Sequence, residues 1–115
     1  MKVKITESNK SGKKMMAVFT KENGRTKTTH FGQAGKPDYT LTGDKSRRKA
    51  YRVRHRKDLN TGDPTRAGYL SYYILWGDSK SRKTNISNYK KRFNFKWIYS
   101  CILVLLNYFI IFILF

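Results

Sequence analysis

The sequence has one cysteine, two histidines and only seven acidic residues among its 115 residues. Cys101 alone forms no disulfide framework, and His30 and His55 are far apart, with no further zinc ligand near either of them. The seven acids are scattered, and no catalytic triad, metal-binding set or nucleotide-binding loop accompanies them. We therefore expect neither an enzyme nor a protein with a cofactor or metal.

Acidic residues are outnumbered by 25 lysines and arginines, which give a formal net charge of +18. All the basic residues lie at or before Lys96. A field of this strength attracts polyanions, which include nucleic acid, anionic lipid headgroups and acidic protein surfaces. The composition alone is compatible with all three kinds of partner.

The hydrophobic pattern divides the chain into a small basic domain, residues 1–94, and an apolar segment, residues 95–115. Strands are predicted at 3–6, 15–21 and 26–31, and the Asn23-Gly24 pair predicts a tight hairpin turn before the last of them. A hairpin alone is unstable in water, so it must pack against helices. We expect an α+β fold in which a small N-terminal antiparallel hairpin or sheet packs on two or three short helices.

Residues 63–77 predict the central helix of this domain. Asp63 is expected to cap its N-terminus, Pro64 to take the first helical position, and Gly77 to end it in the left-handed conformation. The helix is apolar nearly all round, which indicates burial on more than one side or cover by a partner. The residues expected in the core or in an interface are Tyr69, Leu70, Tyr73, Ile74 and Trp76. A further core-facing helix is predicted at 85–93.

Residues 45–57 predict a second, strongly basic helix with Asp44 as its N-cap and eight lysines or arginines. Only Ala50 and Val53 form a narrow apolar face. Repulsion between like charges destabilises such a helix unless an anion neutralises them, although a charge run can also be a solvated face. The residues expected to bind an anionic partner, without reading base sequence, are Arg47, Arg48, Arg52, Arg54 and Arg56.

The segment 97–115 carries no charge, and 19 helical residues span about 28 Å, close to the roughly 30 Å hydrocarbon core of a bilayer. The basic residues before it favour a C-terminal transmembrane helix with the N-terminal domain on the cytosolic side. The residues expected in the membrane or at its surface are Trp97, Tyr99, Leu103, Leu106, Phe109 and Phe112. The alternative is a translated extension of AT-rich DNA beyond an original end near Asn94.

Several motifs occur in a characteristic order: Thr29-His30-Phe31-Gly32, Asp38-Tyr39-Thr40, the arginine-rich helix, Asp63-Pro64-Thr65-Arg66-Ala67-Gly68-Tyr69-Leu70 and Leu75-Trp76. Together, over residues 18–94, they resemble a family of small, basic, uncharacterised proteins encoded by large DNA viruses of algae and protists. Members of that family usually end near the segment that corresponds to residues 89–94, so the apolar tail is a departure from it. The resemblance implies a viral setting and packaging in the particle, and it implies no activity.

Two functions follow from these features. The first is a non-enzymatic minor structural or capsid-associated protein of the virion, anchored in the internal membrane and contacting shell proteins through its basic field. The alternative is a nucleic-acid-binding protein without sequence specificity, which would use the basic helix and not require the tail. The first uses more of the chain, and we expect it from the sequence.

Overall fold

The chain begins with three antiparallel strands, β1 (Lys2–Glu7), β2 (Lys13–Thr20) and β3 (Thr26–Gln33), in the computed structural model, which describes residues 1–95. The strand order is β1-β2-β3, with Val3 opposite Phe19 and Ala17 opposite Thr29. Gly24 has φ +82°, which favours glycine because a side chain would be strained there. The predicted hairpin is confirmed, and a third strand extends it into a sheet.

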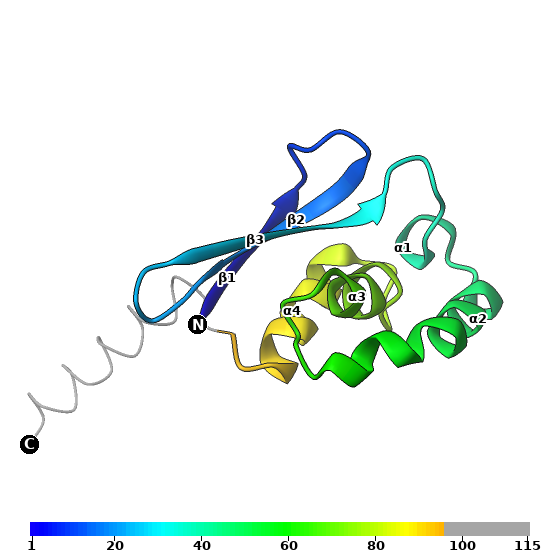
Figure 1. Cartoon of the computed structure of the whole chain (residues 1–115). Coiled ribbons are helices and arrows are strands. Elements are labelled where there is room, and N and C mark those ends of the chain that lie inside the picture. Colours follow the sequence, from blue (N-terminus) through cyan, green and yellow to red (C-terminus); the bar gives the residue numbers. More distant parts are fainter. Residues whose placement is uncertain (96–115) are drawn as a thin grey trace, which may run out of the picture.

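Short helices follow the sheet: α1 (Tyr39–Thr42), α2 (Lys45–His55), the 3₁₀-helix η1 (Arg56–Thr61), α3 (Ala67–Leu70), the π-helical turn η2 (Ser71–Leu75) and α4 (Arg82–Arg92). They lie on one face of the sheet (Figure 1). The expected α+β class is confirmed. The helical part has more pieces than the two or three expected, because α1 was not predicted and because the basic helix and the central helix each continue as a second helical type.

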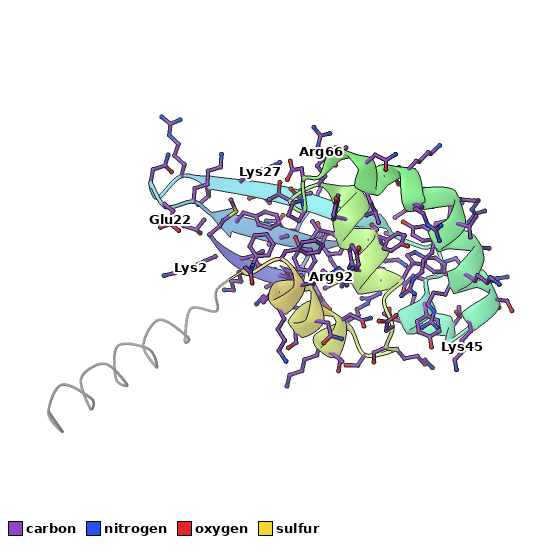
Figure 2. The ribbon with its side chains drawn as sticks, turned by 90° about the horizontal axis from the view of Figure 1, so that it is seen from below. Lys2, Glu22, Lys27, Lys45, Arg66 and Arg92 are labelled. Atoms are coloured by element: carbon purple, nitrogen blue, oxygen red, sulfur yellow. The ribbon has the colours of Figure 1, made fainter. Side chains whose placement is uncertain are left out.

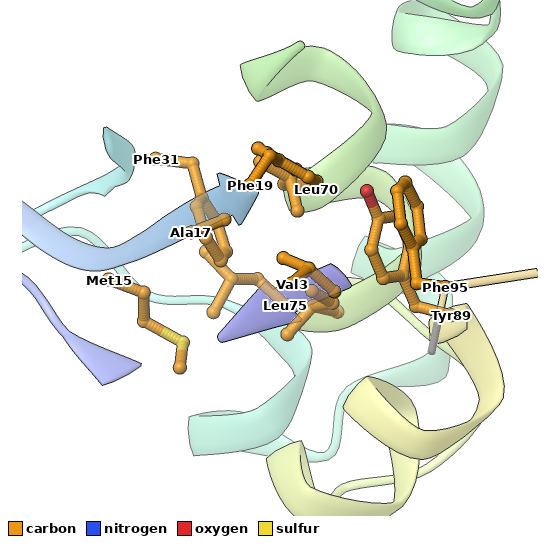
Figure 3. Close-up of a cluster of buried hydrophobic side chains, with 10 residues drawn as sticks. Val3, Met15, Ala17, Phe19, Phe31, Leu70, Leu75, Tyr89 and Phe95 are labelled. Atoms are coloured by element: carbon orange, nitrogen blue, oxygen red, sulfur yellow. The ribbon is translucent and has the colours of Figure 1, made fainter. Parts of the chain in front are cut away.

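The core lies between the inner face of the sheet and the central helical segment (Figure 3). On β2 buried and half-buried residues alternate, which is the two-residue period of a strand with one covered face. The fully covered side chains come from all three strands, the central segment, α4 and the end of the described chain: Val3, Met15, Ala17, Phe19, Phe31, Leu70, Ile74, Leu75, Tyr89 and Phe95. Burial of this apolar surface is the main force that holds the sheet to the helices.

The central helix begins later than the sequence predicted. The Oδ1 atom of Asp63 accepts hydrogen bonds from the backbone N–H and the hydroxyl of Thr65, at 3.0 and 2.6 Å, so Asp63 caps a turn that precedes α3. The expected left-handed end at Gly77 is also wrong, because its φ is not positive. A Cβ at Gly77 would lie 2.3 Å from the Tyr73 carbonyl oxygen and 2.7 Å from Asn85. Glycine is needed there for close packing.

The five residues predicted for the core or an interface divide into two groups. Tyr69, Leu70 and Ile74 are buried, whereas Tyr73 and Trp76 are half-buried and lie at the margin of the core. The last predicted helix is present as α4, where Ser81 accepts a hydrogen bond from the backbone N–H of Thr84. It begins three residues earlier than the sequence suggested.

The predicted membrane segment lies outside the described residues. Within residues 1–95, no helix is long and apolar enough to cross a bilayer. The anchor formed by residues 95–115 therefore stays a prediction.

Candidate functional site

The basic helix α2 begins as predicted and docks through an aromatic stack. Asp44 caps it by accepting hydrogen bonds from the backbone N–H groups of Ser46 and Arg47. The Tyr51 ring lies 4.3 Å from the Trp76 ring at an interplanar angle of 6°, and 4.1 Å from the His55 ring. This stack fixes which side of α2 faces the protein.

Two of the five arginines predicted to bind a partner face inward from α2. Arg48 Nη1 donates to the carbonyl oxygens of Gly77 and Asp78, at 3.3 and 3.0 Å. Arg52 donates from Nε to the Trp76 carbonyl oxygen and from Nη2 to Asp78 Oδ1, both at 2.9 Å. The carbonyl groups at the C-terminal end of a helix carry partial negative charge and lack intrahelical partners. Arg48 and Arg52 satisfy them, so these two side chains hold α2 to the end of the central segment.

The other three arginines, Arg47, Arg54 and Arg56, are exposed and point away from this contact. Two exposed lysines, Lys45 and Lys49, share with Arg56 the flank beside Tyr72, whereas Arg54 lies on the flank beside Tyr51 and His55. We call the five exposed cations of both flanks the outer basic surface: Lys45, Arg47, Lys49, Arg54 and Arg56. Within residues 1–95 the carboxylate paired with this set is Asp44, whose Oδ2 atom lies 3.7 Å from Arg47 Nε. In Figure 2 side chains project freely from this end of the molecule, which is marked by Lys45.

The narrow apolar face predicted on α2 is exposed as well. Ala50 lies at the surface and Val53 is 61% exposed. Apolar residues usually lie on the buried side of a helix. On α2 the buried side is determined instead by the Tyr51 stack and the two inward arginines. Their contacts with Trp76 and Asp78 cannot be read from the sequence of the helix alone.

A hollow runs between α2 and η2 along one side of the outer basic surface. It is bordered by Lys45, Arg48, Lys49, Arg52, Val53, Arg56 and Tyr72, so no carboxylate lines it. The internal hydrogen bonds of Arg48 use Nη1, and those of Arg52 use Nε and Nη2. The remaining guanidinium N–H groups stay available to an anion in the hollow.

Sequence reasoning missed a buried charged cluster beside the sheet, which we call the Asp38 centre: Asp38, Lys14, Thr40 and Arg82. Asp38 is 1% exposed, and its Oδ2 atom lies 2.6 Å from Lys14 Nζ and 3.2 Å from Arg82 Nη2. Its Oδ1 atom accepts hydrogen bonds from the backbone N–H of Thr40, at 2.9 Å, and from the Thr40 hydroxyl. The Asp38 centre thereby caps α1 and joins β2 to α4.

Opposing influences act on the pKa of Asp38. Burial raises this pKa. The hydrogen bonds from Lys14 and Thr40 and the charges of Lys14 and Arg82 lower it by more, so the pKa of Asp38 lies below its usual value of 3.8. Asp38 is therefore ionised at neutral pH, with both oxygens engaged. This arrangement stabilises the fold and leaves no free acid or base for catalysis.

Comparisons with known proteins find one family of unknown function and a relative from a giant virus. The profile of a family of unknown function, DUF5754, matches residues 3–55, which include the sheet, α1 and α2. An uncharacterised protein of Acanthamoeba polyphaga mimivirus is 35% identical over 81 residues, which cover 64% of this chain and 80% of that protein. No solved structure matches the chain. The predicted resemblance to proteins of large DNA viruses is confirmed to this extent.

Proposed function

The chain belongs to the DUF5754 family of unknown function, and we propose that it is a non-enzymatic structural protein that binds nucleic acid through the phosphate backbone without reading base sequence. The observation that carries this proposal is the outer basic surface of α2. Among residues 1–95, Arg47 is the one member of this surface with a carboxylate at ion-pair distance, the partly exposed Asp44, 3.7 Å away.

The dimensions of α2 suit a polyanion. Its 11 residues extend about 16 Å along the helix axis. Duplex DNA carries one negative charge per roughly 1.7 Å of its axis, so more phosphates than cations lie within the reach of this helix. Each phosphate contact releases condensed counterions, which supplies affinity that is the same for every sequence.

Absence of sequence preference follows from the side chains on this surface. Phosphate contacts fix position, whereas base sequence is read by hydrogen bonds to base edges within a groove. The outer cations are long and flexible, and among the residues of α2 no asparagine or glutamine is present to pair with adenine. The guanidinium groups of Arg48 and Arg52 are already engaged with the carbonyl groups of Trp76, Gly77 and Asp78.

The test uses two variants of the full-length chain with equal loss of charge. The outer variant replaces Lys45, Arg47, Lys49, Arg54 and Arg56 by Gln, and the sheet-end variant replaces Lys4, Lys10, Lys13, Lys21 and Arg25, which are also exposed. Fluorescence anisotropy at about 150 mM salt, the physiological ionic strength, measures affinity for labelled duplexes of unrelated sequence. The outer variant is expected to lose affinity for every duplex alike, and the sheet-end variant to retain most of it. No binding by the wild-type chain, or equal losses in both variants, would refute the proposal.

A second candidate function is a membrane-anchored adaptor in the particle of a large DNA virus, as expected from the sequence. The uncharged segment 97–115 favours it, because its length and its basic flank suit a bilayer. In this function α2 would contact an acidic shell protein. Purified particles, separated into shell, membrane and core fractions, test it by mass spectrometry. Recovery with the membrane, resistant to alkaline carbonate, supports the adaptor, and recovery with the genome in the core supports nucleic-acid binding.

A further inference from the structure

A second hollow lies beside the first one, on the other side of Arg52 and Tyr72, which border both. Tyr73, Asn88 and Arg92 also line it, so it is formed by η2, α2 and the last turn of α4. Arg92 is exposed and is labelled in Figure 2. The two hollows make one continuous cationic surface with a tyrosine in the middle.

Two neighbouring aromatic rings on this surface are flanked by a cation at each end. Arg52 Cζ lies 5.8 Å from the centroid of the Tyr72 ring, the Tyr72 and Tyr73 rings are 5.0 Å apart, and Arg92 Cζ lies 4.8 Å from the Tyr73 centroid. We call these four residues the aromatic ladder. The π-helical turn places its two consecutive tyrosines, and turns of this kind occur often at functional sites.

Tyr72 differs from the tyrosines that stabilise the helical layer. The Tyr69 hydroxyl donates to the Leu59 carbonyl oxygen at 2.6 Å, and the Tyr89 hydroxyl donates to the Pro64 carbonyl oxygen. Within residues 1–95 the Tyr72 hydroxyl makes no such bond, and its ring is half-buried at the border of both hollows. The partly exposed ring of Tyr72 therefore lies where a ligand in either hollow would meet it.

We propose that the aromatic ladder binds unpaired nucleotides, so that the protein prefers single-stranded nucleic acid to duplex. An unpaired base stacks on Tyr72, and the backbone follows the cations on either side: Lys49 on α2, Arg56 at the start of η1, and Arg92 on α4. Proteins that bind single strands with little sequence preference combine a cationic groove with aromatic rings, because every base has a flat face to stack. In a duplex those faces are covered by neighbouring base pairs.

One carboxylate borders this site. Asp78 lines the second hollow, and Arg52 Nη2 lies 2.9 Å from its Oδ1 atom, so its charge is balanced before a phosphate arrives. Arg92, at the other end of the ladder, has no carboxylate partner within residues 1–95. The net charge along the ladder is positive, as a nucleic-acid backbone requires.

This inference rests on the proposed function, and its test distinguishes the two. The full-length chain is titrated, by fluorescence anisotropy, with labelled 20-nucleotide single-stranded DNA, single-stranded RNA of the same sequence, and the DNA duplex. The wild-type chain is expected to bind both single strands more tightly than the duplex. Tyr72→Leu should weaken single-strand binding by roughly 5- to 150-fold, the range found when one stacked base loses its aromatic partner, and leave duplex binding unchanged.

Tyr72→Phe is the matched control, because it keeps the ring and removes only the unpaired hydroxyl; it should bind as the wild-type chain does. Arg92→Gln is a second variant, at an exposed position, and should also weaken single-strand binding selectively if Tyr72→Leu fails to fold. Loss on DNA and RNA alike, or on one of them alone, supports the site and identifies the strand that it takes. Equal wild-type affinity for duplex and single strand, or equal losses on both in the two variants, would overturn the inference. In that case a selective effect of the outer variant would still uphold the proposed function.

Discussion

The Asp38 centre and the outer basic surface of α2 use the same kinds of cation in opposite ways. In the Asp38 centre, Lys14 and Arg82 converge on one carboxylate that is 1% exposed. On the outer basic surface, one of the five exposed cations, Arg47, has a carboxylate partner among residues 1–95, and it lies 3.7 Å away at the solvent-exposed start of the helix. The number of basic residues in a chain is thus a poor measure of its binding surface, because the fold itself uses part of the charge.

Burial explains the difference. An ionised group removed from water is costly unless it is paired and hydrogen-bonded, so every cation near Asp38 is held in a fixed geometry. Solvated cations need no internal partner and keep their freedom. Arg48 and Arg52 lie between these extremes, since they satisfy the carbonyl groups at the end of the central segment and also border a hollow.

The largest expected effect is the loss of the carboxylate at the Asp38 centre. Asp38→Ala leaves Lys14, whose side chain is 11% exposed, and Arg82 without the carboxylate that they share. Removing one member of a buried ion pair costs about 3–5 kcal/mol, which is a large part of the stability of a domain this small. Chemical denaturation of the full-length chain, followed by tryptophan fluorescence, measures the change. A loss below about 1 kcal/mol would mean that the Asp38 centre does not hold β2, α1 and α4 together.

A smaller effect of the same centre is a dependence of stability on pH. The pKa of Asp38 is lower in the folded chain than its usual value of 3.8. The ionised Asp38 carboxylate therefore stabilises the fold above that pH, and this stabilisation is lost as the pH falls through the folded pKa. The wild-type chain should therefore lose stability in acid below about pH 4. Asp38→Asn should lack this part of the acid dependence, as thermal melts over a pH series would show. Parallel acid profiles for the two chains would contradict the assignment.

An intermediate effect is expected for the arginines that face inward. Arg52→Ala removes the hydrogen bonds to the Trp76 carbonyl oxygen and to Asp78, but the Arg52 side chain is 26% exposed and that of Asp78 84% exposed. Hydrogen bonds to charged groups contribute about 1.5–3 kcal/mol, and solvent screening lowers this to roughly 1–2 kcal/mol here. Differential scanning calorimetry should show the lower Tm, with Arg54→Ala as the control on the same helix.

The smallest effect on stability is expected on the outer basic surface. Arg56→Ala should change the free energy of unfolding by less than about 0.5 kcal/mol, as surface substitutions usually do. We expect the change to be a small stabilisation, because the substitution removes one of several like charges that repel each other on neighbouring turns. The same calorimetric series measures it. A cost comparable to that of Arg52→Ala would place Arg56 among the residues that hold the fold, and would remove the contrast between the two sides of α2.

Much of the fold was predictable because its signals are local. The Asn23-Gly24 turn, the alternation along β2 and the cap at Asp44 each depend on residues close together in the sequence. The start of the central helix was mispredicted because Asp63 bonds to Thr65 two residues later, a local alternative to helix capping. Its change to a π-helical turn at Ser71 had no sequence signal that we recognised.

The candidate site was predicted only in part, and the missing part is non-local. The sequence indicated five arginines but could not separate those that face the fold from those that face solvent. Arg48 and Arg52 face inward because they contact residues about 25 to 30 positions away. The Asp38 centre was missed for the same reason, since Lys14 and Arg82 come from opposite ends of the domain. Nothing in the sequence singled out Tyr72 on a helix that is apolar nearly all round, and only the packing of α2 and α4 beside it reveals the two hollows.

The most direct test of the central claim, that the outer side of α2 binds the polyanion and the inner side belongs to the fold, is the salt dependence of duplex binding. On duplex DNA the logarithm of affinity falls with the logarithm of salt concentration by about 0.9 for each phosphate contact. Five outer cations, allowing for some that point away, give an expected wild-type slope of roughly 3–4. In the outer variant the slope should fall below about 1, and in the sheet-end variant it should stay at the wild-type value. Slopes that fall equally in both variants would show that the whole basic field acts together, and would contradict the account.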